Sequence, residues 1–151
     1  MKRQMVNGLT MSILIVTVAF VTSAVTANGQ SQRTVTHIPF DFVIGARTLP
    51  AGDYETNSAI SSGAAVMVRS TEAKTAAIRL TNSIQPNPEK TQARLIFHRY
   101  GQTYFLAEVW AGGDNPGRVL VESKQERQLR RELAAVAQSS YETIELVAAL
   151  R

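Results

Sequence analysis

The side chains best suited to metal binding or proton transfer are the only two histidines, His37 and His98, and the carboxylates Asp41 and Glu108. Neutral imidazole and carboxylate groups together suit a first-row metal ion. Their spacing matches no H-x-x-x-H or H-E-x-x-H pattern, and His37 and Asp41, four residues apart in an alternating run, are expected on one strand face. We therefore predict no metal centre, no catalytic residue and no cofactor, with a metal-dependent hydrolase as the third functional hypothesis.

A second concentration of chemically capable side chains lies in residues 93–110, ARLIFHRYGQTYFLAEVW. This segment holds the only tryptophan, two of the four tyrosines and two of the five phenylalanines. Aromatic side chains in a small β protein either build its core or line a ligand cavity. The candidate ligand-binding residues are His98, Arg99, Tyr104, Glu108 and Trp110.

The same segment predicts one long antiparallel hairpin. Two β-rich runs flank Gly101-Gln102, where glycine permits the positive φ of a tight turn. Counting outward from that turn, Arg99 is opposite Tyr104, which places a cation over an aromatic ring. Such a contact stabilises an exposed site by roughly 0.5–1 kcal/mol.

Alternation outward from the turn assigns the remaining residues of the hairpin to two faces. His98 shares its face with Arg94, and the opposite face carries Phe97, Arg99, Glu108 and Trp110. In this register His98 and Glu108 are not partners, although a bulge or a one-residue slip would reverse the assignment. Glu108 lies among apolar neighbours, so if it is buried it needs a partner, and we predict an arginine.

The N-terminus has the features of a secretory signal peptide. Lys2 and Arg3 supply positive charge, and residues 11–25 (MSILIVTVAFVTSAV) are uncharged and largely apolar. We predict cleavage after Ala27, since an apolar run of about 15 residues is shorter than the roughly 20 that cross a bilayer. The alternative is a retained anchor. Cleavage would place the mature protein in the periplasm or outside a bacterial cell.

Removing residues 1–27 takes away two basic residues, so 14 basic and 12 acidic residues remain and the net charge falls from +4 to +2. No block of Lys and Arg lies outside one predicted helix, so the sequence gives no electrostatic nucleic-acid footprint. The chain has no cysteine. It therefore contains no disulfide, Cys-linked lipid anchor or thiol nucleophile, and about 124 residues can bury a core without them.

Alternating, turn-bounded runs predict a single β-rich domain over residues 34–151, preceded by a flexible polar leader at 28–33. Pro39 is expected to break the first run, at 34–44, or to place it at an edge, since proline donates no ladder hydrogen bond. Residues 82–90 predict a loop because they contain two prolines. Further strands are predicted at residues 47–49, 53–56, 64–69, 76–81 and 118–121.

From Ser123 the pattern becomes helical, and Ser123 with Glu126 matches a capping box. The helix is expected near 123–138, with a solvated basic face and a weak pair between Glu126 and Arg130. Residues 141–150 alternate, which favours a last strand over continued helix. Six to eight short strands and one late helix predict a mainly β fold: an antiparallel β-sandwich or small barrel with one C-terminal amphipathic helix.

Three phrases extend from about residue 35 to residue 133: PFDF-x-x-G-x-x-x-LPAG-x-Y from Pro39, HRYG-x-x-YFL-x-E-x-W from His98, and the charged helix that follows Ser123. Together they resemble a family of small secreted bacterial β proteins that carry a signal peptide. The resemblance implies secretion and a compact β domain. It implies no activity, substrate or catalytic residue.

These observations favour an exported, non-enzymatic binding or structural module of the cell envelope or extracellular space. Its expected partner is an envelope protein or a small ligand, with no nucleic acid and no transmembrane span after cleavage. The chain contains no nucleophile elbow, phosphate-binding loop or dinucleotide fingerprint. The alternative is a small apolar-ligand carrier whose strands close into a barrel around an aromatic-lined pocket, and a filled interior would count against it.

Overall fold

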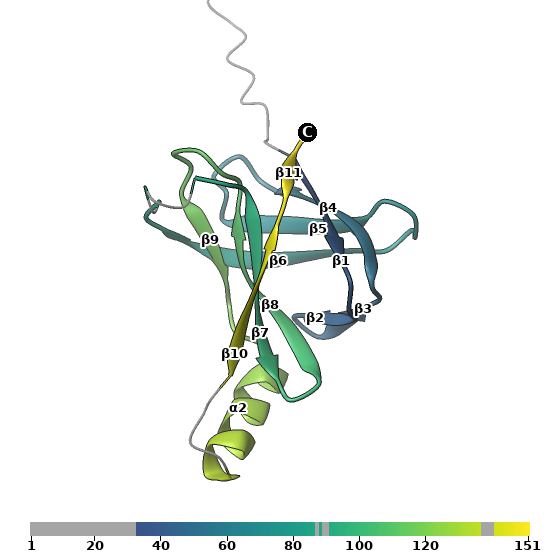
Figure 1. The fold of residues 1–151 in the computed structure, drawn as a ribbon. Coiled ribbons are helices and arrows are strands. Elements are labelled where there is room, and N and C mark those ends of the chain that lie inside the picture. The colour runs from purple at the N-terminus through teal and green to yellow at the C-terminus, as the bar shows by residue number, and fades with distance from the viewer. Residues whose placement is uncertain (1–32, 87, 89–90, 137–140) are drawn as a thin grey trace, which may run out of the picture. The chain divides into compact units, whose positions relative to one another are not determined.

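The computed structural model describes residues 33–86, 88, 91–136 and 141–151. The fold is mainly β, as predicted, and the described part contains a single C-terminal helix, α2 (Lys124–Val136) (Figure 1). The strands are β1 (Thr34–Ile38), β2 (Phe42–Ile44), β3 (Arg47–Leu49), β4 (Gly52–Ser58), β5 (Ala65–Ser70), β6 (Ala76–Ile84), β7 (Arg94–Tyr100), β8 (Thr103–Trp110), β9 (Gly117–Leu120), β10 (Glu142–Val147) and β11 (Ala149–Leu150).

The strands form two layers that share strand β6. Strands β1, β4, β5 and β11 belong to the first layer, and β2, β3 and β7 to β10 belong to the second. Strand β6 joins the layers because its residues 76–80 pair with β5 and its residues 81–84 pair with β9. The sheet is not closed into a barrel, and it is mixed: β2 and β8 are a parallel pair among otherwise antiparallel neighbours in the described residues.

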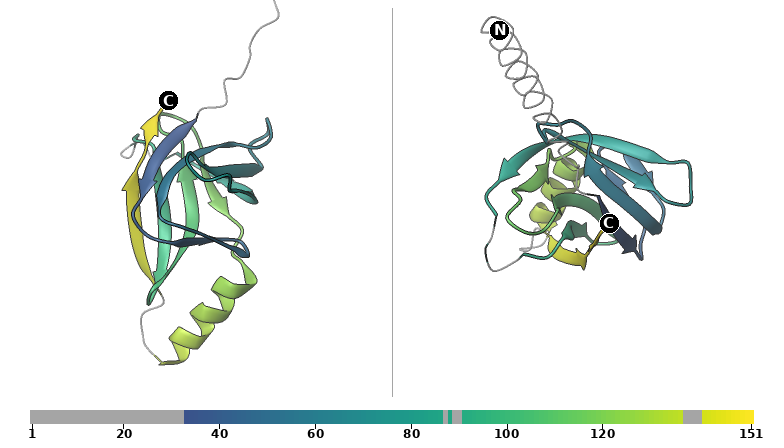
Figure 2. Two further views of the ribbon diagram at one scale, coloured as in Figure 1. Left: turned by 90° about the vertical axis from the view of Figure 1, so that its right-hand side faces the viewer. Right: turned by 90° about the horizontal axis from the view of Figure 1, so that it is seen from above.

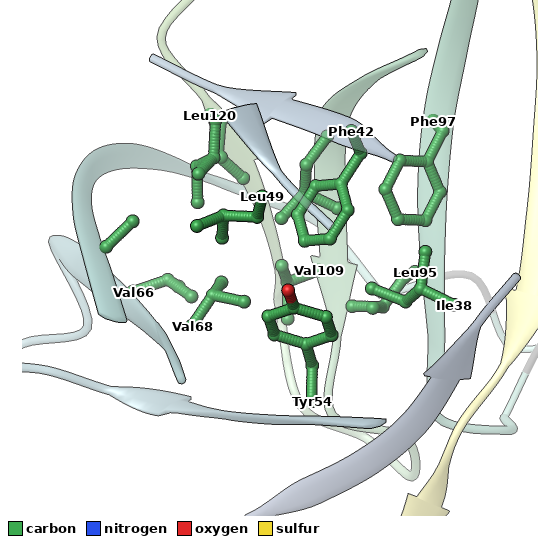
Figure 3. Packing of buried hydrophobic residues seen from close by; sticks show 13 residues of the cluster. Ile38, Phe42, Leu49, Tyr54, Val66, Val68, Leu95, Phe97, Val109 and Leu120 are labelled. Carbon is green, nitrogen blue, oxygen red and sulfur yellow. The ribbon is translucent and has the colours of Figure 1, made fainter. Parts of the chain in front are cut away.

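Apolar side chains from both layers fill the space between them (Figure 3). Tyr54 and Val68 point inward from the first layer, and Phe42 and Phe97 point inward from the second. The ring of Phe42 meets the rings of Tyr54 and Phe97 edge to face, with centroids 5.0 and 5.6 Å apart. Such pairs contribute roughly 0.5–1.5 kcal/mol each beyond the area they bury. The interior of the sandwich is therefore a packed core.

Local sequence explains several strand boundaries. Strand β1 ends at Ile38 and β2 begins at Phe42, so the predicted break falls at Pro39. The β7–β8 turn contains Gly101, whose φ of 61° is the positive value that the prediction required. The described chain has eleven strands rather than six to eight, and β6 runs to Ile84, beyond its predicted end, because its last residues pair with β9. The C-terminal segment is a strand, as predicted.

Helix α2 lies beyond the end of the second layer, next to the turn of the β7–β8 hairpin (Figures 1 and 2). Its half-buried Leu129 and Leu133 pack on a small cluster of Val43, Tyr100 and Phe105. No helix in the described part of the chain is both long and apolar enough to cross a membrane. The predicted signal peptide (1–27) and nearly all of the predicted leader lie outside the described residues.

Candidate binding site between the hairpin and the helix

A β-bulge decides which side chains of β8 face the helix. Near the turn the observed register matches the prediction, but Ile96 is opposite Glu108, so β8 contains one extra residue, Ala107. Leu106 and Val109 both belong to the core. Residues three apart cannot share one face of a regular strand, so the bulge is what brings both inward. In an unbulged strand Glu108 would take the place of Val109, and a carboxylate would enter an apolar interior.

The bulge corrects the predicted faces of the hairpin. Glu108 and Trp110 lie on the face of His98 and Arg94, not on the opposite face. His98 and Glu108 consequently line the same pocket. The prediction that the sheet separates these two side chains was wrong, because counting outward from the turn is valid only as far as the bulge.

Glu126 reaches His98 from the first turn of α2. Its backbone N–H donates to Ser123 Oγ at 3.0 Å, so Ser123 caps the helix as predicted. Its carboxylate lies 3.1 Å from His98 Nδ1, whereas a capping box would turn it back to the Ser123 backbone. Arg130, the predicted partner of Glu126, instead pairs with Glu122 at 3.2 Å. Glu126 is only 5% exposed, so His98 supplies the partner that a buried carboxylate needs and fastens the helix to β7.

A pocket of about 170 Å³ lies beside this pair. That space is large enough to hold more than one water molecule. Three carboxylates face one guanidinium across it, so the pocket is electronegative when the imidazole is neutral. Its charged and polar walls are His98, Glu108, Glu122, Glu126 and Arg130, its aromatic walls are Tyr100 and Tyr141, and its apolar walls are Ala107, Val119 and Leu120.

Tyr100 is a largely buried residue that lines this pocket. The residue is 3% exposed, and its ring meets Phe105 with centroids 5.7 Å apart. Its hydroxyl has no hydrogen-bond partner among the residues that the structure describes. Burial, together with the nearby carboxylates of Glu126 and Glu122, raises the pKa of Tyr100 to about 12. The phenol therefore stays neutral at physiological pH and can both donate and accept a hydrogen bond.

Tyr141 forms a second aromatic wall, which is open to solvent. Its ring centroid lies 4.1 Å from that of His98 and 5.6 Å from that of Tyr100. Tyr141 is 43% exposed, so it lies where the pocket meets the solvent. Any group that enters the pocket from this side passes the face or the edge of an aromatic ring.

Trp110 holds Glu108 in place. Its indole Nε1 donates to Glu108 Oε2 at 2.7 Å, so an indole takes the role for which we predicted an arginine. Arg94 lies over the Trp110 ring, 4.5 Å from the centroid, and its guanidinium is 3.4 Å from Glu145. Gly117 leaves space for the indole, since a Cβ at that position would lie 2.7 Å from the ring. These contacts position the Glu108 carboxylate at the pocket.

The other two predicted site residues, Arg99 and Tyr104, lie on the core face of the hairpin. The Arg99 guanidinium is 5.5 Å from the centroid of the Tyr104 ring, which confirms the predicted cation–π contact. Arg99 also donates to Glu142 at 3.1 Å. Tyr104 stacks on Phe40, with centroids 3.9 Å apart. These two residues close the edge of the core and do not line the pocket.

His37 and Asp41 do not share a strand face, because β1 ends at Ile38. His37 Nδ1 lies 2.7 Å from Asp53, and Asp41 accepts a hydrogen bond from the Ala51 backbone at 2.9 Å. Within the described ranges, no three side chains of His, Cys, Asp or Glu gather in a group that could hold a metal ion.

The pocket residues that sequence reasoning missed are Tyr100, Tyr141, Glu122 and Glu126. The Ser123 capping pattern identified Glu126 as a first-turn residue but assigned its carboxylate to the helix itself. No local pattern relates it to His98, which is 28 positions away. A carboxylate in the first turn of the helix and a histidine in an apolar strand were the available signals.

Comparisons with known proteins returned no match to a protein-family model, a curated protein or a solved structure. The resemblance to the family of secreted β proteins accordingly stays a prediction.

Proposed function

We propose that this protein is an exported, non-enzymatic binding module, and that its binding site is the pocket between the β7–β8 hairpin and helix α2. The observation that carries the proposal is the convergence of four acidic or imidazole side chains on a space of about 170 Å³ that is also lined by the largely buried Tyr100. Binding sites combine shaped walls with a few convergent polar groups. Here Tyr100 and Tyr141 give the walls, and His98, Glu108 and Glu126 give the polar groups.

The polar groups of the pocket are held in position from outside it. Trp110 fixes Glu108, and the Ser123 cap fixes the turn that carries Glu126. Ordered side chains of this kind bind with a smaller loss of conformational entropy. This arrangement supports recognition of a ligand, and the described pocket walls contain no serine, threonine, cysteine or lysine to act as a nucleophile.

An apolar-ligand carrier finds less support. Such a protein needs a large apolar cavity, and the interior between the layers is occupied by the side chains of the core cluster (Figure 3). The pocket beneath the helix is smaller than the roughly 300–1,000 Å³ of ordinary ligand cavities. It suits one small polar group rather than an extended apolar molecule.

Residue-resolved NMR with a fragment library of mixed charge tests the binding site. Protein purified from cells that express the full chain is expected to show hits whose amide shifts cluster at residues 98–108 and 122–130. Ala107→Leu, which fills the pocket from its wall, is expected to abolish these hits while the circular dichroism spectrum is retained. Val119→Phe is a second filling variant if Ala107→Leu fails to fold. Shifts that map elsewhere, or hits that survive both variants, would refute the proposed site.

Export is tested separately by N-terminal sequencing of the protein recovered from the periplasm or medium of a bacterium that expresses the full chain. We expect the mature chain to start at Asn28. Recovery of the protein in the cytosol with an intact N-terminus would contradict export. It would not bear on the binding site, which the NMR experiment tests.

A further inference from the structure

We propose that the pocket beneath α2 recognises a primary ammonium group, carried either by a small alkylamine or by a lysine side chain. This inference rests on the proposed function and specifies its ligand class. Its basis is the combination of an excess of carboxylates, the hydroxyl of a largely buried tyrosine with no partner among the described residues, and an exposed aromatic wall around one small space.

The charge of the pocket selects a cation. Glu108, Glu122 and Glu126 line it, and Arg130 is the one arginine or lysine among its described walls. Arg130 is already paired with Glu122, so it neutralises one carboxylate. The remaining charge is two negative with a neutral His98 and one negative with a protonated His98. An anionic ligand would face repulsion in either state, and a cation would be attracted.

Hydrogen bonding narrows the cation to one that carries N–H groups. Glu108 lines the pocket and receives the Trp110 indole on Oε2, so its other carboxylate oxygen can accept a further hydrogen bond. Tyr100, a residue that is 3% exposed, lines the same pocket, and its hydroxyl oxygen can accept. A primary ammonium has three N–H donors, which suits a carboxylate and a hydroxyl oxygen together. A quaternary ammonium would leave both acceptors without a donor.

Size and aromatic lining favour an alkyl ammonium over a bare metal ion. The space of about 170 Å³ is larger than a single bare cation fills. Tyr141 presents a half-exposed ring at the mouth, 4.1 Å from the His98 ring, where a methylene chain or ammonium can pack. His98 and the three glutamates of the walls are not placed to share one ion: among the described residues, no three His, Cys, Asp or Glu side chains form a group that could hold a metal.

The test compares n-butylamine, n-butanol and butyrate, which have nearly the same shape and differ in charge. Each is titrated at pH 8 and constant ionic strength into protein purified from cells that express the full chain, with amide shifts as the readout. We expect butylamine to bind at the pocket roughly tenfold more tightly than butanol, as one charge-assisted hydrogen bond would provide, and butyrate not to bind. N-acetyl-lysine methylamide, compared with its norleucine analogue, distinguishes a lysine side chain from a free amine.

Variants assign the effect to named groups. Glu108→Gln keeps the shape and the bond from Trp110 but removes a charge, and it is expected to weaken butylamine binding by roughly tenfold. Tyr100→Phe is expected to weaken it several-fold. Glu142→Gln removes a carboxylate that pairs with Arg99 outside the pocket, and is the matched control that should change nothing.

The outcomes separate this inference from the function on which it rests. Equal affinity for butylamine and butanol, or an undiminished affinity in Glu108→Gln, would overturn recognition of an ammonium. Stronger shifts of the same amides with magnesium chloride would replace it with a metal site. If neutral or anionic fragments bind the pocket and amines do not, recognition of an ammonium group is refuted and the proposed binding site is retained. If no probe and no library fragment binds there, both the ammonium proposal and the proposed binding site are refuted.

Discussion

The two faces of the β7–β8 hairpin are built from the same strands but have different roles. The inward face carries Phe97, Leu106 and Val109, which belong to the packed core between the layers. The outward face carries His98 and Glu108, which line a pocket beneath the helix. On the first face these side chains are almost completely shielded from solvent. On the second, His98 and Glu108 have fixed partners, Glu126 and Trp110, and line a partly open pocket.

The difference shows how a small β domain without cysteines separates stability from recognition. Burial of apolar area on the inward face supplies the larger free energy of folding. The outward face contributes less, because each buried polar group there replaces a bond to water with a bond to protein. It can therefore carry charged groups without loss of the fold. The predictions below test this division, from the largest expected effect to the smallest.

Truncation on the inward face should cost the most. Phe97→Ala removes a ring that is 0% exposed and that meets Phe42 in the core. We expect the free energy of unfolding in urea to fall by about 3–5 kcal/mol, from lost burial and the cavity left behind. Phe97→Leu removes fewer atoms, so its free energy of unfolding should lie between those of Phe97→Ala and the wild type. A loss below about 1 kcal/mol would mean that the interior repacks freely.

Tyr100, on the outward face, should make stability depend on pH at the alkaline end. Because the pKa of Tyr100 is raised to about 12 in the folded protein, the unfolded chain loses this proton first as pH rises. Stabilisation is therefore complete below about pH 10 and is lost toward pH 12, by roughly 2–3 kcal/mol for this one group. Urea unfolding across that range measures the loss. Tyr100→Phe should make the free energy of unfolding fall less steeply with pH in this range. An unchanged pH dependence would show that Tyr100 is not the group responsible.

Separating the helix from the hairpin should have an intermediate effect. Glu126→Ala removes the partner of His98 and is expected to cost about 1–3 kcal/mol, the contribution of one charge-assisted, largely buried hydrogen bond. A double-mutant cycle with His98→Ala isolates the pair, and the two changes should be clearly less than additive. Additive losses would show that the two side chains do not interact in solution.

An ion pair at the surface should matter least. Glu142→Gln breaks a 3.1 Å contact with Arg99 in which the Glu142 side chain is 62% exposed. Solvent screens such pairs, so we expect a loss of at most about 0.5 kcal/mol, and less in high salt. A loss comparable with that of Glu126→Ala would mean that the exposed rim of the hairpin contributes as much as the helix contact.

Much of the fold could be predicted because its signals are local. Gly101 marks the hairpin turn, Pro39 interrupts the first strand, and Ser123 begins the helix, since each acts through its own backbone conformation or its nearest turn of chain. The end of β6 could not be predicted in this way. Its last residues are polar and form a strand because β9, more than thirty residues later, offers hydrogen bonds to them.

The candidate site was predicted in part. His98, Glu108 and Trp110 were identified by type, and they do gather at one place, but their common face was missed. In the run from Tyr104 to Trp110 nearly every residue is apolar, so alternation gave no sign of the bulge. Arg99 and Tyr104 were paired correctly with each other and assigned wrongly to the site, because the same bulge that turns Glu108 outward leaves them on the core face.

The sequence by itself determined most of the strands, the hairpin turn, the helix start and the absence of any disulfide, since these depend on neighbouring residues and on composition. Tertiary structure decided the bulge at Ala107 and the pairing of Glu126 with His98. The physical reason is that both are settled by competition between distant groups. The core accepts Val109 and rejects the Glu108 carboxylate, and a buried Glu126 gains more from an imidazole across the interface than from the end of its own helix.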